Sequence, residues 1–176
     1  IEKHKKKWGN IKVIYRPHPW RQNNCQVKSS YGVNIFTDPQ ILALNNDKSI
    51  KTQPDLEYYS GLLKNAEFVM GGLTTMLIEG LIFRKQFLAF IHDDDKHVTN
   101  MANAWKYFEH FKYLGRVDAI TFSYNEPDVE KKMIECWDKK ELLNCHKIDK
   151  DRAWYLFEDG KGYRNRLLSC VDGILD

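Results

Sequence analysis

Short apolar runs alternate with longer amphipathic runs along most of the chain. Five short runs are rich in β-branched or aromatic residues and are predicted to be strands: 11–16, 33–36, 67–70, 87–91 and 119–122. Runs with helical spacing lie between or after them, at 55–64, 74–83, within 99–114, and at 127–138. This alternation predicts an α/β fold with a Rossmann-like parallel sheet flanked by helices.

Two polar segments without periodicity, 21–30 and 45–54, are predicted to be loops at strand ends, where ligands commonly bind. The last part of the chain, 149–176, predicts a helix or turn around Trp154. A break at Asp159 and Gly160 follows, and then an amphipathic helix.

The predicted strand that ends at Met70 runs into Gly71 and Gly72, then into Thr74, Thr75 and a helix. The first turn of a helix carries unpaired N–H groups and the positive end of the helix dipole, and glycines let a phosphate approach the backbone closely. The segment therefore predicts an anion site.

Glu79 lies four residues after Thr75, so the two share one face of the predicted helix. Hydroxyls for a phosphate and a carboxylate for sugar hydroxyls suit a nucleotide or a nucleotide sugar. Two alternatives stay open, because a threonine is also a good helix cap without any ligand and a glutamate is often simply solvated. Capping does not explain the two glycines before Thr74.

A second candidate follows the first predicted strand, where prolines stand on both sides of His18. Prolines stiffen the backbone around the imidazole, and ligands bind at the carboxyl ends of strands in open parallel sheets. His18 is therefore a candidate phosphate ligand or general acid or base, with Arg16 and Arg21 beside it. The alternative is a turn histidine bonded to a backbone carbonyl; the prolines and arginines favour function.

Two further segments carry suggestive side chains. The run from His92 to His97 offers carboxylates and imidazoles, but its spacing fits no standard metal motif, so a solvated loop is preferred and no metal is predicted. We expect His92 to line the cleft. In the aromatic-rich run from Trp105 to Leu114, core packing is favoured over an interdomain or membrane-surface contact.

Length and composition fit one globular domain spanning 1–176, with 43% hydrophobic and 29% charged residues and no apolar segment long enough for a bilayer. The net charge of +3 lacks the basic stripe of a nucleic-acid binder. Four separated cysteines without a CxxC pair indicate free thiols in a reducing cytoplasm. The chain does not begin with Met, and residues 1–8 look like the tail of a helix, so we expect a fragment of a longer protein.

The order strand, Pro-His-Pro, strand, helix, strand, Gly-Gly-x-Thr-Thr-x-x-x-Glu helix, strand, and a late Asp-Gly-Lys before a helix resembles the C-terminal half of GT-B glycosyltransferases. Within that superfamily the chain looks most like the bacterial capsule and wall polymer enzymes, which include CDP-glycerol glycerophosphotransferases, polysialyltransferases and Kdo transferases. Their C-terminal domain binds the donor nucleotide.

The resemblance implies a role for each matching position. His18 and Pro19 correspond to the His-Pro motif, with His18 near the donor phosphate as the catalytic candidate. Thr74 and Thr75 stand where such enzymes place phosphate-binding hydroxyls, and Glu79 matches the acidic residue that contacts the ribose.

The chain also departs from the family pattern. Arg84 stands where many members carry glycine, and Gln86 stands where they carry proline. The acidic general base of the N-terminal acceptor domain has no counterpart, so that domain is expected elsewhere in the full protein.

The resemblance implies transfer from a nucleotide sugar or CDP-linked donor to a glycan or lipid-linked acceptor at the cytoplasmic face, with peripheral membrane contact. No cofactor is expected and no metal is required, because the helix start, His18 and the arginines together meet the charge of the leaving phosphate. An enzyme like UDP-N-acetylglucosamine 2-epimerase and a non-catalytic nucleotide-binding module are the alternatives.

Overall fold

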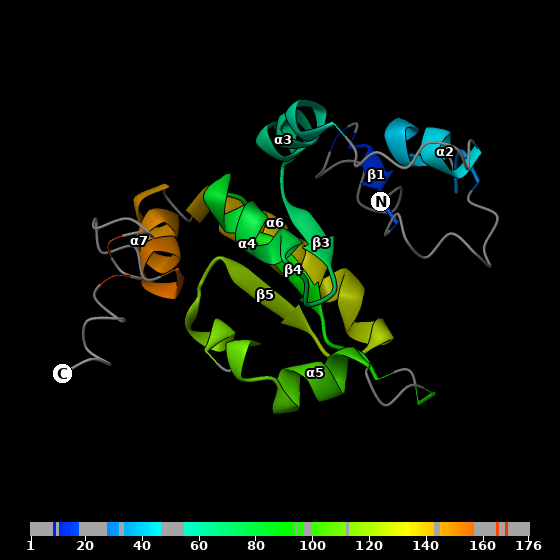
Figure 1. The fold of residues 1–176 in the computed structure, drawn as a ribbon. Helices are drawn as coiled ribbons and strands as arrows, with labels where there is room; N and C mark the ends of the chain where they lie inside the picture. Colours follow the sequence, from blue (N-terminus) through cyan, green and yellow to red (C-terminus); the bar gives the residue numbers. More distant parts are fainter. Residues whose placement is uncertain are drawn as a thin grey trace. The chain divides into compact units, whose positions relative to one another are not determined.

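The computed structural model describes residues 9, 11–17, 28–31, 34–46, 55–93, 95–96, 100–111, 113–142, 145–156, 165 and 168. The fold is α/β and Rossmann-like, with parallel strands in two sheets and helices packed against them (Figure 1). Contacts divide the chain into two compact units, residues 1–60 and 61–176. The predicted fold class is confirmed, but the strands form two sheets of two and three strands.

Unit 1 contains two parallel strands, β1 (Val13–Tyr15) and β2 (Ile35–Thr37). Helix α2 (Pro39–Asn46) follows directly, and α3 (Leu56–Asn65) crosses the boundary between the units. The carboxylate of Asp38 accepts the N–H of Gln40 at 2.8 Å and so starts α2, whose first residue is a proline. Helix α2 was not predicted, and the last residues of this helix overlap the predicted 45–54 loop.

Unit 2 contains the three-stranded parallel sheet β3 (Val69–Gly71), β4 (Phe87–Phe90) and β5 (Ile120–Ser123), in the order β3-β4-β5. Phe87, Leu88 and Ala89 of the central strand β4 are all fully buried. Successive side chains of a strand point to opposite faces, so helices must cover both faces of this sheet.

Four α-helices follow β3 in the described part of unit 2, and the last of them packs on the first: α4 (Met76–Ile82), α5 (Met101–Tyr107), α6 (Val129–Leu142) and α7 (Cys145–Tyr155). Helix α4 packs closely because a Cβ at Gly80 would lie only 3.4 Å from the ring of Phe87. Trp105 of α5 packs on Phe122, 4.8 Å between ring centroids. Phe122 of β5 pairs with Ala89 of β4, and Ala89 lies on the same face of the sheet as Phe87, two residues before it. Helices α4 and α5 therefore cover the same face.

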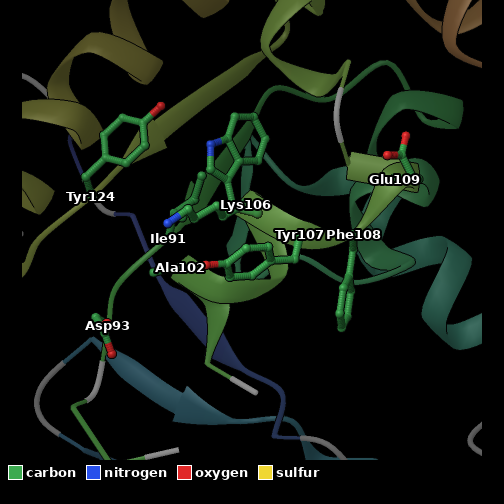
Figure 2. Close-up of a pocket in the computed structure, with 9 residues that line it drawn as sticks. Ile91, Asp93, Ala102, Lys106, Tyr107, Phe108, Glu109 and Tyr124 are labelled. Carbon is green, nitrogen blue, oxygen red and sulfur yellow. The ribbon is translucent and has the colours of Figure 1, made fainter. Parts of the chain in front are cut away.

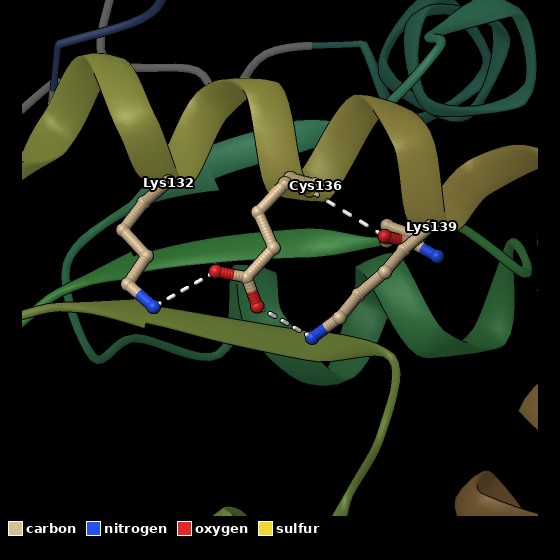
Figure 3. Close-up of polar contacts among 5 residues, drawn as sticks. Lys132, Cys136 and Lys139 are labelled. Carbon is tan, nitrogen blue, oxygen red and sulfur yellow. Dashed lines mark hydrogen bonds and ion pairs between the residues drawn. The ribbon is translucent and has the colours of Figure 1, made fainter.

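Helix α6 covers the opposite face. The thiol of Cys136 on α6 donates to Oε1 of Gln86 at 3.6 Å (Figure 3). Gln86 lies one residue before Phe87, the first residue of β4. The crossover helices α4 and α5 therefore lie on one face of the sheet and α6 on the other, which are the layers of a Rossmann-like unit.

The end of α4 has an unusual backbone. The N–H of Lys85 bonds the carbonyl of Gly80 at 2.8 Å and the N–H of Arg84 bonds that of Leu81 at 3.0 Å, which is the Schellman pattern. Arg84 is left-handed, with φ 55°, a conformation that favours glycine. Its guanidinium bonds Asp149 of α7.

All five predicted strands are confirmed with shifts of one or two residues at their ends. The predicted helices at 55–64, 74–83, within 99–114 and at 127–138 correspond to α3, α4, α5 and α6; a short 3-10 turn at Glu126–Asp128 precedes α6. Helix α7 starts at Cys145, before the predicted 149, and the predicted break at Asp159 and Gly160 lies outside the described residues. No helix within the described part of the chain is both long and apolar enough to cross a membrane.

Candidate functional site

The three strands of unit 2 end at one edge of their sheet, because they are parallel and lie in register. Gly72 follows β3, Ile91 follows β4 and Tyr124 follows β5 at this edge, which we call the carboxyl edge. Ligands of open parallel sheets bind outside the carboxyl ends of the strands. The carboxyl edge is therefore the part of unit 2 where a functional site is expected.

The glycine turn after β3 is packed under a methionine. The N–H of Leu73 donates to Sδ of Met101 at 3.3 Å, and a Cβ at Gly72 would lie 3.1 Å from that sulfur. A Cβ at Gly71 would lie 3.7 Å from the Phe87 ring. The close approach that Gly72 permits is thus used by Met101, so a ligand reaching this turn has to come from the side of Thr74 and Thr75.

Thr74 and Thr75 lie exposed immediately before α4. Thr75 occupies the position before the first helical residue, but its φ of −58° and ψ of −23° are helical and its hydroxyl makes no capping hydrogen bond. Ordinary capping by Thr75, the alternative considered from the sequence, does not occur. The hydroxyl is therefore available to a ligand.

The backbone of the same turn also presents donors. The N–H groups of Leu77 and Glu79 bond the carbonyls of Thr74 and Thr75, both at 3.1 Å. Among the residues that the structure describes, the N–H groups of Thr75 and Met76 have no acceptor. Exposed N–H groups at a helix start attract anions.

Glu79 lies half-buried one turn further along α4. Its backbone N–H ties it to Thr75, as the sequence spacing predicted for two residues on one helix face. The structure thus brings Gly71, Gly72, Thr74, Thr75 and Glu79 together within one strand-turn-helix segment of unit 2.

The candidates of the first unit are Arg16, His18 and Arg21. Arg16 forms an ion pair with Asp38, whose side chain is fully buried, and its guanidinium stacks 4.7 Å from the ring centroid of Tyr59. The positive charge of Arg16 is therefore already engaged within unit 1. His18 and Arg21 lie outside the described residues, so their roles stay predictions.

The same cluster in unit 1 includes the phenol of Tyr58. Burial raises the pKa of Tyr58 above its ordinary value, and the charge of the neighbouring Asp38 carboxylate and a hydrogen bond to it raise it further. Tyr58 thus stays protonated and acts as a donor to Asp38.

A pocket of about 660 Å³ lies at the carboxyl edge of unit 2 (Figure 2). Its walls come from the ends of β4 and β5 and from α5 with the residues that follow this helix. The lining residues are Ile91, Asp93, Ala102, Trp105, Lys106, Tyr107, Phe108, Glu109 and Tyr124. The volume lies within the range of small-molecule sites, about 300–1,000 Å³.

Asp93 is the carboxylate of this pocket with a defined orientation. Its Oδ1 accepts the N–H of Asp95 at 2.9 Å and the side-chain amide of Asn100 at 2.5 Å. Asn100 is itself buried and caps α5 by accepting the N–H of Asn103 at 2.8 Å. No donor in the described part of the chain reaches Oδ2 of Asp93, so this oxygen can accept from a ligand.

His92, expected to line the cleft, is instead held against β5. Its Nε2 lies 3.1 Å from Oγ of Ser123, and that hydroxyl donates its only proton to the carbonyl of Asn125 at 3.1 Å. Nε2 must therefore carry the proton and donate to Ser123. The bond ties the ends of β4 and β5 together and so fixes Ile91 and Asp93, the neighbours of His92 that line the pocket.

The aromatic run from Trp105 onward has two environments. Trp105 packs on Phe122 and Leu114 is fully buried, as core packing predicts. Tyr107, Phe108 and Tyr113 are exposed to 65%, 47% and 47%, which core packing does not explain. The first two of these three side chains line the pocket.

Comparison with known proteins identifies no relative of this chain. No protein-family model, curated protein or solved structure gave a significant match to this chain. Within the described residues no group of three or more acidic, histidine or cysteine side chains is placed to hold a metal ion.

The sequence indicated the Gly-Thr turn but not the pocket. Asp93 and Tyr124 could have been found by noting that each follows the end of a predicted parallel strand, where side chains meet. The run at 92–97 was considered as a metal site, and His92 was the one residue of it expected to line the cleft; Tyr124 carried no motif of its own.

Proposed function

We propose that the chain binds the nucleotide-activated donor of a GT-B glycosyl- or glycerophosphotransferase, with the donor phosphate at the start of α4. The observation that carries this proposal is the turn at Thr75 at the carboxyl edge. Thr75 is exposed and its hydroxyl makes no capping hydrogen bond, and the described part of the chain offers no acceptor for the N–H groups of Thr75 and Met76. A nucleotide sugar or a CDP-linked alcohol offers the anionic phosphate that such a group of donors binds.

In the proposed reaction an acceptor hydroxyl attacks the donor, the bond to the nucleotide phosphate breaks, and negative charge grows on the leaving phosphate. The Thr75 and Met76 N–H groups and the Thr75 hydroxyl stabilise that charge. A hydrogen bond or a proton from His18 to the donor is proposed from the sequence alone, because His18 lies outside the described residues. The proton of the acceptor hydroxyl goes to a base on the second domain of the transferase.

The remaining candidates have supporting roles in the proposal. The carboxylate of Glu79, one turn from Thr75, accepts hydrogen bonds from the ribose hydroxyls. Arg16, already paired with Asp38, holds the segment that leads to His18 rather than binding the phosphate. Arg21 contributes positive charge. The acceptor, a glycan or a lipid-linked glycan, binds to an N-terminal domain at the cytoplasmic face of the membrane.

Calorimetric titration with CDP, CMP, UDP and GDP tests donor binding and identifies the base. We expect His18→Ala and Glu79→Ala each to weaken binding of the preferred nucleotide by about 1–3 kcal/mol, because each removes a charged hydrogen bond. His146→Ala and Glu57→Ala, exposed residues of α7 and α3, are matched controls and should leave the affinity unchanged. The absence of binding by all four nucleotides, or unchanged affinity in both site variants, overturns the proposal.

Product analysis separates transfer from epimerisation in the full-length protein. A transferase consumes the nucleotide sugar only when an acceptor is present and releases the nucleotide. An epimerase interconverts nucleotide sugars without any acceptor, and a non-catalytic module changes neither.

A further inference from the structure

The pocket at the carboxyl edge has a chemistry of its own, distinct from the phosphate donors at Thr75. Its walls carry four aromatic side chains, and two of these, Tyr107 and Tyr124, are exposed to 65% and 53%. Their rings offer apolar faces, while the phenol hydroxyls can take part in hydrogen bonds. A ligand with one apolar face and a polar rim fits such walls.

Two of the aromatic side chains in the wall, Trp105 and Tyr124, lie against Phe122 of β5. Trp105 packs on Phe122 with ring centroids 4.8 Å apart, and the ring centroids of Phe122 and Tyr124 are 6.5 Å apart. The Lys106 ammonium lies 5.0 Å from the ring centroid of Tyr107. A pre-positioned wall binds a rigid ring without first ordering mobile side chains.

The polar groups of the pocket favour hydroxyl donors. Oδ1 of Asp93 accepts hydrogen bonds from the Asp95 N–H and the Asn100 amide. These two bonds fix the orientation of the carboxylate and therefore the position of its other oxygen, Oδ2. A carboxylate oxygen held in this way accepts hydroxyl protons well. Lys106 provides a donor for a hydroxyl oxygen on the same wall.

The charged residues that line the pocket disfavour an anionic ligand. Asp93 and Glu109 contribute two carboxylates against the single ammonium of Lys106, so the pocket is net negative. A phosphate would be repelled there, and so would an anionic lipid surface. An uncharged ring with hydroxyls meets no such repulsion.

From these observations we infer that the pocket binds an uncharged sugar ring, with the apolar C–H face of the ring against Tyr107 and Tyr124 and its hydroxyls on Oδ2 of Asp93. This ring belongs either to the donor or to a glycan chain. Only that assignment of the ring rests on the proposed function; the pocket is argued from its own residues.

The test is a titration of the protein with neutral oligosaccharides of glucose, galactose and N-acetylglucosamine, in which heteronuclear NMR detects binding. In parallel, the preferred nucleotide is compared with its nucleotide sugars. Tyr107→Ala and Asp93→Asn are the site variants; Asn keeps the Oδ1 acceptor for Asp95 and Asn100 and changes only Oδ2. Tyr113→Ala, a tyrosine exposed to 47% outside the pocket, is the control.

Saturable binding of at least one neutral oligosaccharide, weakened about tenfold or more by both site variants and unchanged in Tyr113→Ala, supports a glycan in the pocket. A nucleotide sugar that binds more tightly than its nucleotide, with the advantage lost in both site variants, supports the donor sugar. If no sugar binds in either form, or binding ignores Tyr107→Ala and Asp93→Asn, the inference is wrong. Binding to phosphatidylglycerol vesicles that both variants abolish would also overturn it, because the pocket would then be a membrane contact.

Failure of this inference differs from failure of the proposed function. Nucleotide binding that is sensitive to Glu79→Ala but without any sugar contribution would leave the donor site and remove the sugar pocket. Oligosaccharide binding without nucleotide binding would leave the sugar pocket and remove the donor site.

Discussion

Nε of Arg84 donates a hydrogen bond to Oδ1 of Asp149 at 2.9 Å, while the backbone of Arg84 holds a left-handed φ of 55°. One residue therefore does two things that oppose each other. Its side chain ties the end of α4 to α7, and its Cβ makes the Schellman turn less favourable than glycine would.

This opposition predicts the effect of two substitutions. Arg84→Ala loses the ion pair and keeps the left-handed conformation, whereas Arg84→Gly loses the ion pair and relieves the backbone. We expect the glycine variant to be more stable than the alanine variant by about 1 kcal/mol, measured by urea unfolding followed by circular dichroism. An alanine variant as stable as the glycine variant would show that this turn is not left-handed in solution.

The same pair predicts a pH dependence. The hydrogen bond from Arg84 lowers the pKa of Asp149 below its ordinary value of 3.8. A depressed folded-state pKa contributes stability above the unfolded value, and this contribution is lost as the pH falls through the folded value. The stability difference between wild type and Arg84→Gly should therefore be constant at neutral pH and change only below about pH 4.

Unit 1 depends on the buried carboxylate of Asp38. Asp38→Asn leaves Arg16, only 16% exposed, without its anionic partner, so we expect a loss of about 3 kcal/mol. Hydrogen exchange of peptides covering β1 and α2 measures it. Asp55→Asn is the matched control, because Asp55 also accepts an N–H two residues on, that of Glu57 at 2.9 Å, but is exposed. Equal protection in both variants would contradict a structural role for the Arg16 pair.

The thiol of Cys136 should not react with alkylating reagents in the folded protein. Burial raises the pKa of this thiol to about 12, and Sγ donates to Gln86 (Figure 3). At pH 8 the thiolate is then about a thousandfold rarer than in the unfolded chain, whose thiol titrates near 9.0. Iodoacetamide followed by peptide mass spectrometry should label Cys136 only after urea unfolding. Rapid labelling of the native protein would place the thiol in a more open environment.

The raised pKa of the Cys136 thiol also sets the direction of alkaline destabilisation. Between about pH 9 and 12 the unfolded thiol loses its proton and the folded one retains it, so the unfolded state binds fewer protons. The free energy of unfolding should fall as the pH rises through this window, and Cys136→Ala should reduce the slope. An unchanged slope in the variant would assign the effect to other groups.

Strand positions and fold class could be predicted from the sequence because apolar runs of strand length are local signals. The division into two sheets could not, since the pattern of a strand does not say which strand it pairs with. Helix α2 was missed although Asp38 and Pro39 form a start signal, because the polar residues from Asn45 onward suggested a loop.

The candidate site was only partly predictable for a similar reason. The Gly-Thr turn is contiguous, so its spacing could be recognised, but nothing local to Gly72 shows that Met101 fills the space above it. The pocket combines residues after β4, residues after β5 and the helix α5 between them. Its existence depends on how these segments pack.

The central claim is that a donor phosphate binds the N–H groups that precede and begin α4. ¹⁵N NMR titration with the preferred nucleotide, CDP in the first instance, observes these groups directly. The account predicts that the amide resonances of Thr75 and Met76 shift downfield with a common saturation curve, while that of Leu77, whose N–H already bonds Thr74, moves little. Saturating nucleotide that perturbs other amides and leaves Thr75 and Met76 in place would contradict the claim.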